Sequence, residues 1–139
     1  MGRARLRVLA MSAVAASIAA GCSAAAGGSS ASAVPAHAIV TFEVEDERFK
    51  VEVRTADLVA HAQELLAGQD VPSIPVGTVV RDDPGPNAPW SWHLDPTTIR
   101  FADATIEGCD ALPSEVAADL DGNRYCPWSA TVVAVDGAP

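Results

Sequence analysis

The alternation of apolar and polar residues predicts a β-hairpin at the start of the folded part of the chain. In residues 48–54, phenylalanine and two valines alternate with charged side chains, so one face of the strand is apolar. A second β-rich run precedes it at residues 38–42. The acidic segment Glu45–Glu47 between the two runs indicates the turn.

Two other stretches have helical periodicity. Thr55 is a suitable N-cap, Asp57 favours the first turn, and Gly68 ends the segment. The expected buried stripe of this helix is Leu58, Ala62, Leu65 and Leu66. His61 lies in the same helix, where we expect a surface or rim position. A second, short helix is predicted over residues 112–120, where leucine, valine and leucine recur every four residues.

The remaining β-rich runs predict that the domain is α+β, a small single domain over residues 37–136 with a mostly antiparallel sheet, one longer helix and one short helix. Residues 81–89 form a loop stiffened by three prolines. The further strands are expected at residues 76–80, 90–94, 98–101, 104–109 and 128–135.

The N-terminal residues indicate export. Three arginines precede an apolar run at residues 8–20, which is too short to span a bilayer. The small residues that follow lead into Cys22 and resemble the lipobox of bacterial lipoprotein signal peptides. We therefore expect a signal peptide over residues 1–21, lipidation of Cys22, and a flexible Ala/Gly/Ser linker over residues 22–36. The alternative is a plain secretory signal cut after an Ala-x-Ala site such as residues 24–26.

Charge changes the picture of the mature chain. All eighteen acidic residues follow Cys22, whereas three of the nine bases precede it, so the mature chain has a net charge near −12. Such a chain is a poor partner for nucleic acid or for anionic lipid headgroups. Two interpretations remain, namely simple solubility and binding of a cation or a basic partner.

Two cysteines remain after Cys22. In an exported domain, Cys109 and Cys126 are expected to form a disulfide. The closed loop of about 17 residues would contribute roughly 3 kcal/mol. The alternative is a reactive thiol or a metal pair, although no Cys-x-x-Cys spacing occurs.

The tryptophans Trp90, Trp92 and Trp128 fall in two short segments, and they fit either a hydrophobic core or a ligand-binding groove. His93 and Asp95 would share one face of a strand. They could form structural hydrogen bonds, a metal site with Asp103, or a catalytic pair. No nucleophile elbow, Walker motif, dinucleotide fingerprint or His-Glu-x-x-His pattern is present, and no cofactor is expected.

Three motifs carry a resemblance to a known family. They are Pro-Trp-Ser-Trp-His-Leu-Asp-Pro at residues 89–96, Phe-Ala-Asp-Ala-Thr-Ile-Glu-Gly-Cys-Asp at 101–110, and Cys-Pro-Trp-Ser at 126–129. Over residues 40–135 the chain resembles the N-terminal domain of the slime-mould calmodulin-binding protein family, which also occurs in secreted bacterial proteins. The resemblance implies fold and export. Calmodulin binding is not expected, because the mature chain is acidic and has no basic amphipathic helix.

The sequence thus predicts a non-enzymatic domain, held by lipid on the extracytoplasmic face of the cell membrane, that binds an envelope protein or a small ligand. The expected surface is residues 82–95, with Trp128 as a further candidate. The alternatives are a hydrolase that uses His93 with a carboxylate or a metal, and a structural envelope protein.

Overall fold

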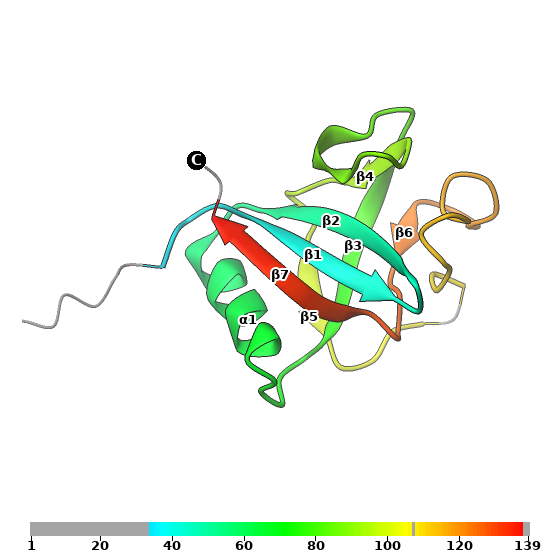
Figure 1. Ribbon diagram of the computed structural model, residues 1–139. Coiled ribbons are helices and arrows are strands. Elements are labelled where there is room, and N and C mark those ends of the chain that lie inside the picture. Colours follow the sequence, from blue (N-terminus) through cyan, green and yellow to red (C-terminus); the bar gives the residue numbers. More distant parts are fainter. Residues whose placement is uncertain (1–33, 107, 138–139) are drawn as a thin grey trace, which may run out of the picture. The chain divides into compact units, whose positions relative to one another are not determined.

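The computed structural model describes residues 34–106 and 108–137 (Figure 1). The predicted signal peptide, Cys22 and residues 22–33 of the predicted linker lie outside these ranges. The described residues form a small single domain with mostly antiparallel sheets, one α-helix and one disulfide, Cys109–Cys126.

The first sheet contains the predicted hairpin. Strands β1 (Ala38–Val44) and β2 (Glu47–Val53) are antiparallel, and β7 (Thr131–Gly137) pairs with the other side of β1. The predicted alternation is confirmed, because Phe49, Val51 and Val53 are all buried. Phe42 lies opposite Phe49, and their rings stack with centroids 5.2 Å apart.

The second sheet is organised by β3 (Ile74–Arg81). Along its length β3 pairs antiparallel with β5 (Arg100–Ala102), β6 (Arg124–Tyr125) and β4 (Trp92–Leu94). The short 3-10 helix η1 (Gly85–Asn87) lies in the loop before β4. The hydrophobic core fills the space between the two sheets, where Phe49 contacts the rings of both Trp92 and Tyr125.

The helix α1 (Ala56–Leu66) begins as predicted, since the Thr55 hydroxyl accepts a hydrogen bond from the backbone N–H of Leu58. It runs beside β7 at one edge of the first sheet (Figure 1). Its buried residues are Val59 and Ala62. The predicted stripe was therefore wrong in part, because Leu66 is 45% exposed and Leu65 only half-buried. The helix ends where it leaves the sheet edge, so its last turn has less to pack against.

The predicted second helix is replaced by successive turns at residues 113–119. Among the described residues of this segment, one backbone bond, from Asp119 N–H to the Glu115 carbonyl, spans four residues. A single bond does not offset the cost of nucleating a helix. Arg81 instead takes up the free carbonyl groups, because its guanidinium donates to the carbonyls of Val116, Ala117, Leu120 and Gly122.

The predicted strand at residues 104–109 was also wrong. Residues 104–106 and 108–109 form no strand, since β3 already pairs along its length with three other strands. Cys109 is held by its disulfide and by its carbonyl oxygen, which accepts a hydrogen bond of 2.7 Å from Cys126 N–H.

Candidate functional site

The proline-rich loop before β4 closes the outer edge of β2. Asn87 is 1% exposed, and its Oδ1 accepts a hydrogen bond of 2.7 Å from the backbone N–H of Lys50. Its Nδ2 donates to the carbonyl of Trp92. One amide side chain thus joins an edge strand of the first sheet to a strand of the second. Pairing of this kind protects an edge that would otherwise expose free N–H and C=O groups.

The two tryptophans of the loop and strand serve the interior. Trp92 is 1% exposed, contacts Phe49 and Tyr125, and donates its indole N–H to the carbonyl of Pro113. Trp90 lies before β4 and is half-buried, and its indole N–H donates to the carbonyl of Arg48 at 2.7 Å. Both polar N–H groups are therefore used inside the domain.

His93 and Asp95 have different partners. The Nδ1 of His93 lies 2.8 Å from the carbonyl oxygen of Asp83 and 3.9 Å from its carboxylate. Gly85 permits this packing, because it adopts a φ of +48° and a Cβ at this position would approach the His93 ring to 3.1 Å. The His93 ring therefore packs under the loop.

Asp95 organises the turn that follows β4. Its Oδ1 accepts hydrogen bonds from the hydroxyl and the backbone N–H of Thr97. These bonds, the hydroxyl bond first, lower the pKa of Asp95 below its ordinary value. The neighbouring His61 has a comparable structural setting on α1, where its Nε2 contacts the carbonyl of Pro72 and its ring stacks on Phe101.

The third residue considered for a metal site, Asp103, lies at another surface, where it borders a hollow beside Trp128. Within residues 34–106 and 108–137, no three His, Cys, Asp or Glu side chains converge in an arrangement that could hold a metal ion.

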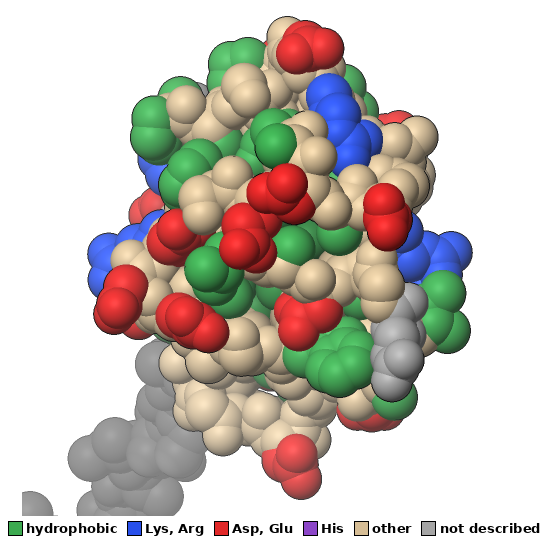
Figure 2. Space-filling model, turned by 90° about the vertical axis from the view of Figure 1, so that its right-hand side faces the viewer, with side chains coloured by type: hydrophobic (Ala, Val, Ile, Leu, Met, Phe, Trp, Pro, Cys, Tyr) green, Lys and Arg blue, Asp and Glu red, His purple; other side chains and the backbone are tan. Residues whose placement is uncertain are grey.

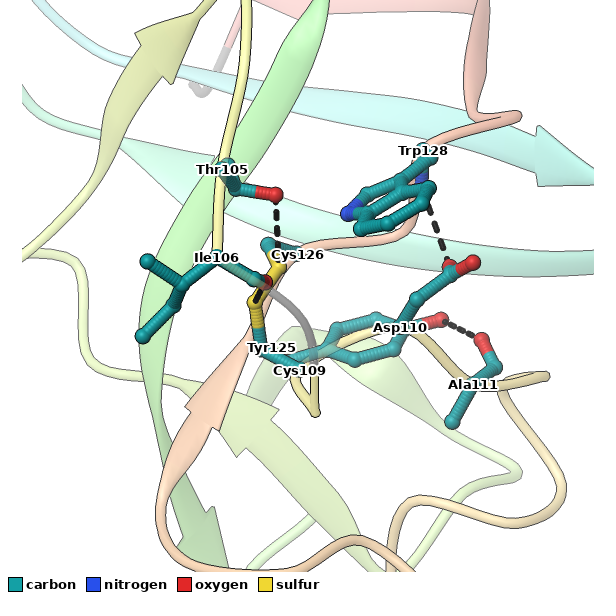
Figure 3. Close-up of a disulfide and its surroundings, with 8 residues drawn as sticks. All are labelled: Thr105, Ile106, Cys109, Asp110, Ala111, Tyr125, Cys126 and Trp128. Carbon is teal, nitrogen blue, oxygen red and sulfur yellow. Dashed lines mark hydrogen bonds between the residues drawn. A yellow bond between two sulfur atoms is a disulfide. The ribbon is translucent and has the colours of Figure 1, made fainter.

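Trp128 differs from the other two tryptophans because its side chain is 46% exposed. It follows the disulfide residue Cys126, and its backbone N–H donates to the carboxylate of Asp110 at 3.0 Å (Figure 3). On the opposite side of the disulfide, the hydroxyl of Thr105 lies 3.2 Å from the Cys126 sulfur. The segment that carries Trp128 is thus fixed at several points, although the indole itself remains accessible.

Hollows flank this segment. One is lined by Trp128 with Ile74, Asp103, Ala104 and Thr105, and a second by residues 128–132 with Leu65 and Ser73. A third, lined by Glu45, Asp110, Glu115 and neighbouring residues, meets the second at Ser129. Their volumes are about 310, 330 and 200 Å³ respectively. We call the surface formed by these three hollows the Trp128 groove.

Carboxylates surround this part of the molecule. Figure 2 shows acidic side chains spread across one face, with hydrophobic side chains between them and basic side chains towards its margin. The same charge is felt by buried Tyr125, whose pKa is raised by burial first and then by Asp110, Glu47 and Glu115. The Tyr125 hydroxyl stays protonated and donates to the carbonyl of Ala111 at 3.0 Å.

The sequence singled out Trp128 but missed the rest of the groove. Leu65, Ser73, Glu45 and Glu115 belong to segments far apart in the chain, and none lies in a motif. One available signal was the unexplained exposure pattern of α1, in which Leu65 and Leu66 extend beyond the part of the helix that packs against the domain.

Comparison with known families places the chain. The family model for the N-terminal domain of the calmodulin-binding protein family matches residues 36–139, and the chain therefore belongs to this domain family. No curated protein and no solved structure matches the chain. In the described ranges, the helices are too short or too polar to cross a membrane.

Proposed function

We propose that this member of the domain family is a lipid-anchored binding domain on the extracytoplasmic face of the cell membrane, and that its ligand or protein partner is held at the Trp128 groove. The exposure of Trp128 carries the proposal. A large apolar side chain that remains accessible, in a segment fixed by a disulfide, is typical of a binding surface.

The other candidate residues support the same assignment by their own contacts. Trp92 is buried, the indole of Trp90 is hydrogen-bonded to Arg48, and His93 packs under the proline-rich loop. These side chains stabilise the domain, and the Trp128 groove is the remaining surface on which an aromatic side chain is open to a partner. A binding role without catalysis fits the separate hydrogen-bond partners of His93 and Asp95.

The anchor is tested by the intact mass of the protein purified from its native membranes. We expect a chain that begins at Cys22 and carries the added mass of two or three acyl chains, which hold a protein on a bilayer stably where a single chain does not. A bare chain cut at another position would show a freely secreted domain and overturn the anchoring proposal.

The binding surface is tested by photo-crosslinking in the same membranes. Benzoylphenylalanine replaces Ser129 in the groove or, as a control, Asp57 at the start of α1. We expect a discrete product from position 129 that is suppressed by excess unlabelled protein and is not suppressed by the Trp128→Ala variant. Identical products from both positions, or equal competition by Trp128→Ala, would contradict the proposal.

A further inference from the structure

The three hollows of the Trp128 groove form one continuous surface. The hollow beside Asp103 and the hollow beside Leu65 share Trp128 as a lining residue, and the latter shares Ser129 with the hollow beside Glu115. A row of hollows along one chain segment suits an occupant with several side chains in sequence. It is a poorer match for one compact ring, which would fill a single hollow.

The groove carries charge of one sign. Its lining residues include Glu45, Asp103, Asp110 and Glu115, and they include no lysine or arginine. Asp110 and Glu115 accept backbone hydrogen bonds, but none of the four carboxylates forms a salt bridge with a described residue. The nearest chain segments add no positive charge, because α1 and β7 also lack lysine and arginine.

Trp128 provides the third element of recognition. The face of an indole ring attracts a lysine or arginine side chain, and it also packs against the apolar stem of that side chain. An exposed indole between carboxylates is therefore complementary to a cationic side chain in both charge and shape.

We propose that the occupant of the Trp128 groove is an extended basic segment of a protein partner, with one lysine or arginine placed over the Trp128 ring and others beside the groove carboxylates. This inference rests on the proposed binding function and specifies its partner class. A second copy of this chain is a weaker match, because an acidic face would meet another acidic molecule.

The test uses the full lipidated protein in nanodiscs of zwitterionic phosphatidylcholine, which bring no net lipid charge to the assay. The probes are hexalysine and hexaarginine, with hexaglutamine, hexaglutamate and cellohexaose for comparison. Binding is followed by titration calorimetry and by tryptophan fluorescence, in which exposed Trp128 reports on the groove. We expect binding of the two basic peptides alone, weakened about tenfold or more between 50 and 200 mM salt, because screening reduces attraction between exposed charges.

Variants locate the site. Trp128→Leu keeps an apolar side chain and removes the ring face, and we expect about a threefold loss of affinity for hexaarginine. Asp103→Asn and Glu115→Gln should each lower affinity by a similar factor, and the double variant by more. Asp57→Asn on α1 removes the same charge outside the groove, and it should leave affinity within about twofold because its charge is distant and screened.

Other outcomes would overturn the inference in distinct ways. Equal losses from Asp57→Asn and Asp103→Asn would show general attraction to an acidic protein. Salt-independent binding of cellohexaose or hexaglutamine would show a neutral ligand, and no binding of any probe would remove the basic partner. In each of these cases the crosslinks from position 129 could persist, so the proposed binding function would stand without this partner class. Self-association that is lost in Trp128→Ala would assign the groove to a second copy.

Discussion

The two tryptophan-bearing segments of this domain have similar compositions and opposite surroundings. The segment at residues 89–96 turns its aromatic side chains inward, and its loop clamps the edge of β2 through Asn87. The segment at residues 126–129 has a buried disulfide residue and an exposed indole. The difference shows that a cluster of Trp, His and Pro can serve folding, and that exposure distinguishes a candidate recognition residue from a core residue.

The largest test of this comparison is Trp92→Ala. Truncating an aromatic side chain that is 1% exposed should lower the free energy of unfolding by about 3–5 kcal/mol. Urea unfolding followed by circular dichroism measures the change. A loss below about 1 kcal/mol would show that Trp92 is not a core residue.

The disulfide should rank next. Replacing both Cys109 and Cys126 by serine opens a loop with a sequence separation of 17 and should lower stability by roughly 3 kcal/mol. The same unfolding measurement applies, with the unmodified protein under reducing conditions as the matched control. An unchanged midpoint in both samples would show that the Trp128 segment is fixed by its other contacts alone.

Asn87 tests the clamp between the sheets. Asn87→Ala leaves the N–H of Lys50 and the carbonyl of Trp92 without their partner, which should lower stability by about 1–3 kcal/mol. Ser91→Ala, at an exposed position of the same segment, should change it by less than about 0.5 kcal/mol. Similar losses in the two variants would contradict the role of Asn87.

Acid should weaken the first sheet through Glu52. The pKa of this carboxyl is lowered, mainly by its hydrogen bond from Arg54, with a smaller contribution from His37. Because the folded-state pKa lies below the ordinary value, the stabilisation is complete above about pH 4.5 and is lost as the pH falls through the folded-state pKa. Melting temperatures from pH 6 to 2.5 should therefore fall less steeply in Glu52→Gln. Glu64→Gln on α1 serves as the control, and an unchanged slope in Glu52→Gln would contradict the prediction.

The smallest expected stability effect is that of Trp128→Ala. Because nearly half of this side chain is already exposed, its removal should lower the unfolding free energy by only about 0.5–1 kcal/mol. The same variant should abolish specific competition in the crosslinking experiment. A stability loss as large as that of Trp92→Ala would place Trp128 in the core and remove the distinction between the two segments.

Local periodicity accounted for the parts of the fold that satisfy themselves within a short segment. The hairpin of β1 and β2 and the start of α1 at Thr55 were predicted from neighbouring residues, because alternation and capping act over a few positions. The expected strand at residues 104–109 failed because pairing depends on a vacant neighbouring strand. The expected helix at residues 112–120 failed because Arg81, remote in the sequence, binds its carbonyl groups.

The candidate site was predictable only in part for the same reason. The sequence identified Trp128 as an aromatic residue beside a disulfide, and it identified the acidic character of the mature chain. It could not show that Glu45 from the first hairpin and Leu65 from α1 border the same groove, since no sequence pattern links these segments.

The sequence by itself determined the small α+β domain, the disulfide pair, the family and the expectation of export, because each follows from composition or from residues close together in the chain. The tertiary structure alone decided the roles of the three tryptophans. Their intrinsic chemistry is identical, and only packing between the two sheets determines which indole is enclosed and which remains open to a partner.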